Sequence, residues 1–410
     1  MTSNTMSQQT RVPRTMQALH LPSSFSNETT PGGPLSLKYE TDRPVPKPGA
    51  NQYLIKVQTV CVSVNECLQG ASASKSMRDS GMFLERPMAD GIDKVHGLIP
   101  GREFCGEVIS TPKEDYASYT GPAFKVGQEV MGLLADGEGR DGAAADYVLA
   151  TENELTWKPQ NLAAADVATI PLDALIAWQG LFGYATLDPD DGPCNKPADG
   201  PLRVLVTNAG QSEVGKQAIR LLRCQSLFPH HVPNLMGGAG ERETSMWVCA
   251  TGSRDEHDFL RKELGADVVT ANADIAAAFR ENGWEPVDIV FDCVGVGGAL
   301  LREAHSPVVV KDHGHVLTPS RAPSGHPEKP SEWDERTEIM NRNLTSEVID
   351  VKPNMKQLAK IAQLVEKGVL RPADSYQVED LLHGQQTLVH AQKAGAPKAV
   401  LRTDLVLSQI

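Results

Sequence analysis

The sequence predicts an α/β protein of two domains, an irregular β unit and a doubly wound parallel sheet. Short β-type runs separated by Pro and Gly turns continue from Met16 to Ala150, a spacing typical of a partly open barrel. From Val204 onward, strand-like runs alternate with helical segments, which is the pattern of a parallel sheet covered by helices. A last run, "KAVLR" (398–402), could rejoin the β unit. The simplest assembly therefore inserts the parallel-sheet domain before that last strand.

The β unit is expected to contain six short runs between turn residues. In chain order they are "TMQALHL", "LSLKYE", "NQYLIKVQTVCVSV", "FCGEVIS", "GQEVMGLL" and "AADYVLA". After Ala150 the composition changes, and "LAAADVATIPLDALIAWQGLFGYA" places its apolar residues at helical spacing. This segment marks the passage into the second domain.

The second domain shows the strand–helix alternation. Its strand-like runs are "VLVT", "MWVCATGS", "DVVTA", "VDIVFDCVG" and "GHVLTPS". Two stretches, 226–245 and 321–338, interrupt the alternation and are expected to be surface insertions. The resulting division assigns residues 1–165 and 352–410 to the β unit and residues 166–351 to the parallel-sheet domain.

Composition excludes several classes of partner. The 410 residues carry a formal net charge of −13, which disfavours a nucleic-acid surface, and no apolar run approaches the roughly 20 residues of a membrane-spanning helix. The seven cysteines are scattered without a CxxC pair, which argues against a disulfide framework and fits a reducing compartment. The first sixteen residues lack an apolar face, so we interpret them as a tail and expect a cytoplasmic protein.

The segment "VLVTNAGQSEVGKQAIRLLRC" (204–224) predicts a strand, a tight turn and a helix that bind a dinucleotide. Such a turn uses small residues for the turn itself, for the approach to the diphosphate and for close helix packing. Ala209 and Gly210 can make the turn, Ser212 takes the place of the second glycine, and Gly215 permits the packing. The prediction is that this incomplete motif is a working cofactor loop.

Glu213 is the difficulty of this hypothesis, because a carboxylate facing the ligand would repel phosphate. It must therefore point away, into solvent or toward a cation such as Lys216 or Arg220. Val214, beside it in the first helical turn, and Cys293, at the end of a later strand-like run, complete the predicted cofactor-binding set.

The end of the next strand indicates which cofactor is used. Sites for NAD place an acid about 20 residues after the glycines, where it binds the ribose hydroxyls. Here "MWVCAT" is followed by Gly252, Ser253 and Arg254, and the acids come later. A hydroxyl and a guanidinium suit a 2′-phosphate. Ser253 and Arg254 are thus predicted to bind NADPH.

At this point the chain resembles the medium-chain dehydrogenase/reductase superfamily, in particular its zinc-independent quinone-oxidoreductase and enoyl-reductase branch. The resemblance extends from Met16 to Leu405 and rests on the order of its motifs. These are "PGREFCGEV" (100–108), "GAAADYV", "IPLDALIAWQGLF", "KELGADVV", "FDCVG", "DVKPNMKQLAKIAQLVEKGVLRP" and "KAVLR". The resemblance implies a GroES-like irregular β-barrel catalytic domain joined to a Rossmann nucleotide-binding domain.

The resemblance also bears on zinc. Zinc-dependent relatives carry a Cys and a His at positions that are occupied here by Asn65 and Arg102, and their four-cysteine lobe is missing. A catalytic zinc needs about three protein ligands, so we predict that there is no metal site. Asn65 matches the Asn of the zinc-free branch, where the resemblance places it near the nicotinamide; a turn-capping Asn is the alternative.

The chain departs from this branch at the expected proton donor. Glu66, Leu68 and Gly70 stand where relatives often have "PxD" and a nearby Tyr or Lys. The loop 71–98 has no Tyr, although it offers four other polar candidates. These are Lys75, Arg78, Asp79 and His96. Asp173, near the expected nicotinamide pocket, is a further candidate: it could bind substrate, act as a base or sit at a domain seam.

The leading hypothesis is an NADPH-dependent reductase that transfers hydride to a conjugated carbonyl (enoyl) or quinone compound, with Asn65 and Asp173 as the candidate catalytic residues. The long insertions suit a specialised biosynthetic substrate. Two alternatives remain on the same fold: a non-redox cyclase or isomerase, and a cofactor-binding scaffold protein. The expected partner is a small molecule, with no nucleic acid and no membrane, and the expected state is a monomer or homodimer.

Overall fold

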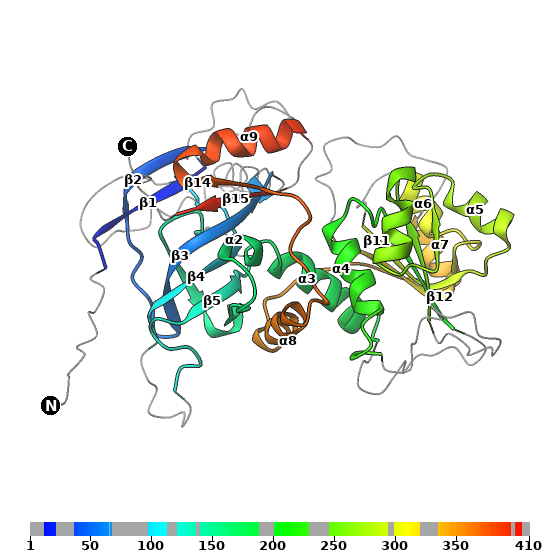
Figure 1. Ribbon diagram of the computed structural model, residues 1–410. Coiled ribbons are helices and arrows are strands. Elements are labelled where there is room, and N and C mark those ends of the chain that lie inside the picture. Colours follow the sequence, from blue (N-terminus) through cyan, green and yellow to red (C-terminus); the bar gives the residue numbers. More distant parts are fainter. Residues whose placement is uncertain are drawn as a thin grey trace. The chain divides into compact units, whose positions relative to one another are not determined.

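A computed structural model describes residues 12–21, 37–64, 66–67, 97–112, 121–136, 140–187, 201–228, 246–293, 299–319, 335–394 and 398–403. The chain divides into two compact units (Figure 1). Unit 1 comprises Met1–Pro171, Pro353–Ala362 and Pro372–Ile410, and unit 2 comprises Leu172–Lys352 and Gln363–Arg371. The segment Gln363–Arg371 thus belongs to unit 2, whereas the sequence-based division placed it with the β unit.

Unit 1 is built on a seven-stranded sheet with the order β14-β15-β3-β4-β5-β7, in which β6 also pairs with β3. Its strands are β3 (Gln52–Ser63), β4 (Glu103–Ser110), β5 (Glu129–Leu133), β6 (Tyr147–Thr151), β7 (Leu155–Trp157), β14 (Gln377–Asp380) and β15 (Lys398–Arg402). Strands β1 (Thr15–His20) and β2 (Lys38–Pro44) form a separate antiparallel pair. The described pairings run as an open path from β14 to β7, so we describe this unit as a sheet.

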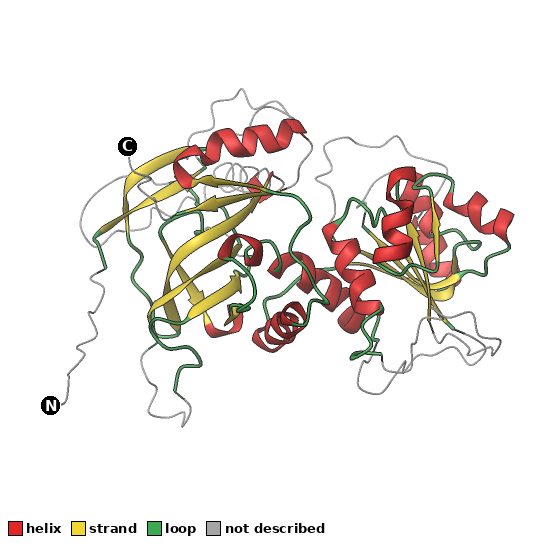
Figure 2. Cartoon of the chain, viewed as in Figure 1, coloured by secondary structure: helices red, strands yellow, loops and turns green. Residues whose placement is uncertain are grey.

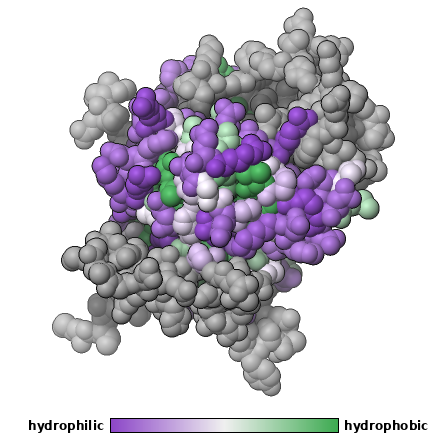
Figure 3. Space-filling view, turned by 90° about the vertical axis from the view of Figure 1, so that its right-hand side faces the viewer, coloured by the Kyte–Doolittle hydropathy of each residue, from purple (hydrophilic) through white to green (hydrophobic). Residues whose placement is uncertain are grey.

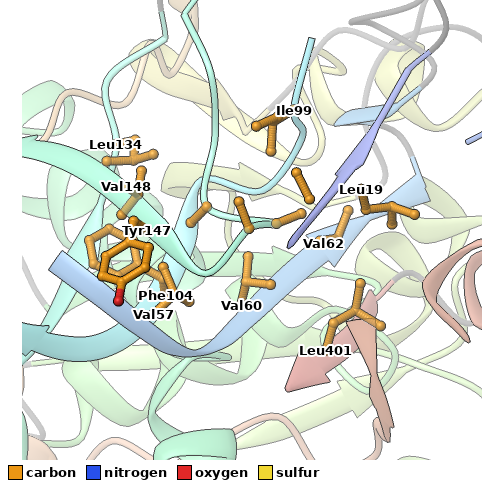
Figure 4. Packing of buried hydrophobic residues seen from close by; sticks show 14 of the residues in the cluster. Leu19, Val57, Val60, Val62, Ile99, Phe104, Leu134, Tyr147, Val148 and Leu401 are labelled. Carbon is orange, nitrogen blue, oxygen red and sulfur yellow. The ribbon is translucent and has the colours of Figure 1, made fainter. Parts of the chain in front are cut away.

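The carboxyl-terminal strand returns to unit 1, as predicted from "KAVLR". Strand β15 pairs antiparallel with β3, with Val400 opposite Cys61. Strand β3 is long because "QYLIKVQTVCVS" is rich in β-branched residues, which fit a pleated and half-buried surface. Figure 4 shows the packed interior, in which Val60 and Val62 of β3 lie near Leu401 of β15. Fully burying one such side chain contributes about 2 kcal/mol.

Unit 2 contains a six-stranded sheet with the order β10-β9-β8-β11-β12-β13, and every neighbouring pair is parallel. Its strands are β8 (Leu202–Thr207), β9 (Met246–Thr251), β10 (Val268–Thr270), β11 (Val287–Asp292), β12 (Val310–Thr318) and β13 (Thr345–Val348). The predicted doubly wound sheet is therefore confirmed. The order reverses between β8 and β11, and in such sheets ligands bind at the carboxyl ends of the strands at that point.

The helices are distributed between both units (Figure 2). They are α2 (Ala164–Val167), α3 (Pro171–Trp178), α4 (Glu213–Leu222), α5 (Ile275–Asn282), α6 (Ala299–Ala304), α7 (Glu335–Arg342), α8 (Met355–Glu366) and α9 (Gly384–Ala394). Helices α4 and α6 pack against β8 and β11, beside the reversal. Figure 3 shows a largely hydrophilic face with small hydrophobic patches. In the described part of the chain, none of the helices has the length and apolar character required to span a membrane.

One buried carboxylate organises the end of the β6–β7 connection in unit 1. Glu154 is 2% exposed and accepts hydrogen bonds from the backbone N–H groups of Ala135 and Thr151, both at 2.7 Å. Arg140 pairs with it through both terminal nitrogens. Burial alone would raise the pKa of Glu154, but Arg140 and the N–H donors outweigh burial and hold the pKa below its usual range.

Replacing Glu154 by Gln should therefore destabilise the protein in a pH-dependent way. At pH 7 we expect Glu154→Gln to lower the free energy of unfolding by about 2 kcal/mol, since hydrogen bonds to a charged group are lost. A carboxyl whose folded pKa is depressed stabilises fully above the unfolded pKa of about 4.3, and this stabilisation is lost as the pH falls through the folded value. Urea denaturation across this range should show that the difference in unfolding free energy between the unmutated protein and Glu154→Gln becomes smaller as the pH falls. Glu379→Gln, at an exposed position in unit 1, is the control; an equal loss in both variants would contradict the prediction.

Candidate functional site

The carboxyl edge of the sheet in unit 2 carries a network of polar side chains. Thr207 ends β8, and its hydroxyl donates to Asp292 Oδ1, at the end of β11, over 2.7 Å. Thr251 ends β9; its hydroxyl donates to Asn272 Oδ1 at 2.6 Å and accepts from the Asn208 N–H at 2.8 Å. These bonds join β8 to the strand on each side of it, where the order reverses.

The turn after β8 depends on an asparagine that sequence reasoning did not single out. Asn208 has φ +47°, in the left-handed region that Asn tolerates better than most residues. Its side-chain oxygen accepts from Asn272 Nδ2 at 3.1 Å, and the following Ala209 N–H donates to Thr251 O at 2.8 Å. The turn assigned to Ala209 and Gly210 thus begins one residue earlier. The signal in the sequence was an Asn directly after a strand.

Helix α4 begins where the sequence predicted a diphosphate-binding helix. Ser212 is its N-cap, and the Ser212 hydroxyl accepts from the Gly215 N–H at 3.1 Å. A Cβ on Gly215 would lie 3.0 Å from Ala209 Cα and 3.2 Å from Cys293 Sγ. The helix therefore approaches the turn as closely as glycine allows. Val214, which belongs to the predicted cofactor-binding set, is buried in this first turn, with 8% of its surface exposed.

Glu213 is directed to a cation, as the cofactor-loop hypothesis requires. Lys216 Nζ donates to Glu213 Oε1 at 2.8 Å, and the two side chains are 7% and 14% exposed, respectively. Lys216 was one of the two partners suggested from the sequence. The pair neutralises the carboxylate within the first turn of α4.

A second carboxylate, which the sequence analysis missed, enters the loop from β9. Glu256 Oε2 accepts from the Ser253 N–H at 2.7 Å, and the two residues form a capping box around the short helical turn Arg254–Glu256. A Cβ on Gly210 would lie only 2.4 Å from Glu256 Cδ, and a Cβ on Gly252 would lie 3.0 Å from Glu256 Oε2. The carboxylate therefore occupies a cradle between two glycines. Ser253 and Arg254 themselves are exposed.

Asp173, Cys293 and Ser212 come together beside the start of α4. Asp173 is 7% exposed on α3, and the Cys293 thiol is hydrogen-bonded to the Ser212 side chain. Burial raises the pKa of the Cys293 thiol, and the charges of Asp292 and Asp173 raise it further. The thiol is thus kept protonated, which makes it a neutral lining group rather than a nucleophile.

Unit 1 contains the turn of the "PGREFCGEV" motif (100–108), which we call the signature turn. Gly101 has φ +99°, and its N–H donates to Glu66 Oε1 at 2.9 Å. The carboxyl group of Glu66 is buried, and burial raises its pKa to about 7; Glu103 adds to the rise, while the Gly101 N–H and Arg102 oppose it. Asn65 lies outside the described residues, as do Leu68 and Gly70. The four polar candidates of the loop, Lys75, Arg78, Asp79 and His96, also lie outside them.

The residues of unit 2 fit a dinucleotide, with one constraint. A polar strand edge, a left-handed turn and a capped helix start lie at the reversal of strand order, which suits a diphosphate near the helix N-terminus. The constraint is Glu256, because any group placed between Gly210 and Gly252 must bind its carboxylate or displace it. Among the described residues, no group of three His, Cys, Asp or Glu side chains could hold a metal ion.

Comparison with known proteins agrees with this architecture. A family model described as zinc-binding dehydrogenase matches residues 264–383. A probable zinc-binding mitochondrial oxidoreductase of Arthroderma benhamiae is 25% identical over 366 residues, which cover 88% of this chain and 89% of that protein. A solved structure of the quinone oxidoreductase from Coxiella burnetii superposes with a TM-score of 0.65 and 21% identity over 95% of this chain and all of that chain.

Two further relatives are named for their activities. The mitochondrial NAD(P)H oxidoreductase RTN4IP1 of Drosophila melanogaster is 26% identical over 62% of this chain, and this chain spans about half, 54%, of that protein. The trans-enoyl reductase tndF of Aspergillus flavipes is 26% identical over 69% of this chain and 74% of that protein.

Substitutions in the first turn of α4 test the cofactor loop. Gly215→Val should abolish binding of a nicotinamide dinucleotide, because the side chain would collide with Ala209 and Cys293. Glu213→Gln should leave the affinity within a few-fold, because the carboxylate faces Lys216. Binding is measured by quenching of protein fluorescence. Gly183→Val, where a Cβ meets nothing within 4 Å, is the control for the same substitution in unit 2. Normal binding by a folded Gly215→Val protein would show that the loop is a remnant.

Proposed function

The chain belongs to the medium-chain dehydrogenase/reductase superfamily, and from this premise we propose that it is an NADPH-dependent reductase that transfers hydride to a conjugated carbonyl (enoyl) or quinone compound. The observation that carries the proposal is the strand edge of unit 2, where the Asn208–Gly210 turn, the Ser212 cap and Gly215 meet. The relatives are named oxidoreductases, and an enoyl reductase and a quinone oxidoreductase are among them.

The bound nicotinamide would supply the hydride, and the chain's own residues would supply position and surroundings. The turn after β8 and the N-terminus of α4 would hold the diphosphate through backbone N–H groups. The protonated Cys293, packed near Gly215, and the buried Asp173 would line the same end of the sheet. Asn65 is proposed, from the family resemblance, to lie near the nicotinamide. Asp173 and Asn65 remain the proposed catalytic residues of the predicted set.

The choice of NADPH rests on Ser253 and Arg254, and Glu256 acts against it. A guanidinium at the end of β9 can make a charge-assisted bond to a 2′-phosphate. The Glu256 carboxylate lies beside the same strand end and would repel that phosphate, although the Ser253 N–H already offsets part of its charge. We therefore propose a preference for NADPH that depends on Arg254 and is moderated by Glu256.

A cofactor-binding scaffold is the second candidate, and Glu256 is the observation that favours it. The Glu256 carboxylate, held between Gly210 and Gly252, already places there the negative charge that the phosphate of a ligand would otherwise bring. The third possibility, a cyclase or isomerase, would use the buried Asp173 as its base. Measured oxidation of NADPH with an acceptor would distinguish a reductase from the scaffold and from the cyclase or isomerase.

The remaining proposals concern partners and location. We propose a small-molecule substrate, with no nucleic acid and no metal ion, and a monomer or homodimer. A cytoplasmic location also stays a prediction, since two of the relatives above are named mitochondrial. Residues 1–11 of the tail lie outside the described residues.

Turnover of NADPH tests the proposed function. The purified protein should oxidise NADPH with at least one member of a panel of enones and quinones, monitored by loss of nicotinamide absorbance. The activity should survive chelators, and elemental analysis should find no stoichiometric zinc, because an amide at Asn65 and a guanidinium at Arg102 are poor ligands for it. One zinc per chain would overturn the metal proposal. Tight NADPH binding without oxidation by any acceptor would favour the scaffold.

Cofactor preference provides a separate prediction. NADPH should bind at least about tenfold more tightly than NADH, which corresponds to roughly 1.4 kcal/mol from one charge-assisted contact. Arg254→Ala should remove most of this preference, and Glu256→Gln should increase it. Arg261→Ala, at an exposed position beyond the strand end, is the control. Equal affinities of the unmutated protein for the two cofactors, measured by fluorescence titration, would refute the assignment.

A further inference from the structure

A cavity of about 420 Å³ lies in unit 2 at the carboxyl-terminal end of α4. This volume is within the range of about 300–1,000 Å³ that is usual for small-molecule sites. The described residues that line it come from three segments of unit 2, namely the end of α4, the short helix Phe259–Glu263 with the residue after it, and the segment after α8. Helix α4 begins at the cofactor loop, and its 10 residues span about 15 Å, so the cavity is separate from that loop.

Four of the lining side chains are cations, and one is an acid. The cations are Arg220, Arg223, Lys367 and Arg371, and the acid is Glu263. Like charges around one cavity repel one another, most strongly where water is partly excluded. The whole chain carries a formal net charge of −13, so its composition does not account for this local excess of positive charge. Such an excess around a concave surface favours an anionic ligand.

Helix dipoles account for three of these cations singly, but not for their convergence. Arg220 and Arg223 stand at the end of α4, and Lys367 directly follows α8. A cation at the carboxyl-terminal end of a helix interacts favourably with its dipole. The dipole does not explain why two helix ends and Arg371 line the same cavity.

Arg223 is held in one orientation by the turn that follows the short helix. Its Nε donates to Gly265 O at 2.8 Å, and its Nη2 donates to Asp267. Gly265 has φ +81°, a left-handed conformation that glycine adopts at no steric cost. Because the guanidinium is planar, these two bonds also fix the direction of Nη1, which makes no hydrogen bond to a described residue.

A buried glutamine places the segment Lys367–Arg371 against α4. Directly beyond α8, Gly368 has φ +73°, the left-handed conformation with which helices commonly end. Gln217 of α4 is 1% exposed, and its Nε2 donates to the backbone carbonyl of Arg371. The Gln217 side-chain oxygen accepts from Arg220 Nη1 at 3.4 Å. One glutamine thus holds the backbone of one lining cation and the side chain of another.

The cavity also has an apolar side. Phe259, Leu264 and Val369 line it together with the buried Cys224. Phe259 is half-buried on the short helix. An inorganic ion would leave these side chains uncovered, so the lining fits a ligand that has an organic body as well as an anionic group.

We propose that this cavity binds a small organic phosphate, with the phosphate group on the four cations and the organic body against Phe259. A phosphate monoester carries about −1.5 to −2 charge at pH 7 and offers three acceptor oxygens, which suits several cations better than the single charge of a carboxylate. Arginine binds phosphate through two parallel N–H groups, and three of the four cations are arginines. The site does not depend on the reductase function proposed above.

Titration with phenyl phosphate tests the site, because this probe joins a phosphate group to one aromatic ring. Calorimetry on the full chain should show binding that added salt weakens. Lys367→Gln and Arg371→Gln should each weaken binding by about tenfold or more, since each removes a charge-assisted contact. Both residues are exposed, so both variants should fold. Benzoate should bind at least about tenfold more weakly than phenyl phosphate.

Glu263→Gln provides a change in the opposite direction. It removes the carboxylate among the described lining residues and should tighten the binding of phenyl phosphate by up to about fivefold, the usual size for an exposed charge. Arg261→Gln and Lys262→Gln are the matched controls. Both residues are exposed on the same short helix without lining the cavity, and both variants should keep the affinity of the unmutated protein.

Three results would overturn this inference. They are the absence of phenyl phosphate binding, an unchanged affinity in both Lys367→Gln and Arg371→Gln, and an equal affinity for benzoate. None of these measurements uses turnover of NADPH. The failure of this site and the failure of the reductase function are therefore separate outcomes.

Discussion

The hydrogen bonds at the carboxyl edge of the parallel sheet are the constraint on which unit 2 depends. Beyond the last residue of a strand, backbone groups lose their ladder partners and must find others. Thr251 supplies them to the neighbouring strand, since its hydroxyl accepts the Asn208 N–H and its carbonyl accepts the Ala209 N–H. On the other side of β8, the Thr207 hydroxyl accepts the Cys293 N–H at 3.0 Å and donates to Asp292 Oδ1. The turn that would receive a diphosphate is therefore shaped by β9 and β11, not by its own glycines alone.

The buried charges of unit 1 likewise depend on their hydrogen-bond partners. A buried carboxylate is unfavourable unless it is paired and hydrogen-bonded. Glu154 is paired with Arg140, and Glu103 with Lys398. Glu66 receives a backbone N–H, but burial still dominates its pKa, and Arg102 keeps one buried donor without an acceptor among the described residues. Among the described residues of unit 1, the signature turn thus holds two charged groups that are only partly compensated.

Much of the candidate site was visible in the sequence, apart from two residues. The strand–turn–helix pattern located Ser212 and Gly215 because a cap and a close-packed glycine are local features. Asn208 and Glu256 were missed. Both stand in recognisable local motifs, an Asn after a strand and a Ser-x-x-Glu capping box. That Glu256 lies against Gly210 depends on β8 and β9 being neighbours, which a local motif does not specify.

The sequence by itself determined the elements and their order. The period of apolar residues distinguishes strands from helices locally, and the alternation from Val204 onward requires a parallel sheet. The tertiary structure decided which side chains share a space. Lys216 neutralises Glu213, Asp173 reaches the vicinity of Cys293, and Glu66 meets the turn at Gly101 across 35 residues. Charge, burial and hydrogen bonding act over a few ångströms, whereas the residues that make these contacts are brought together only when the strands pair and the helices pack.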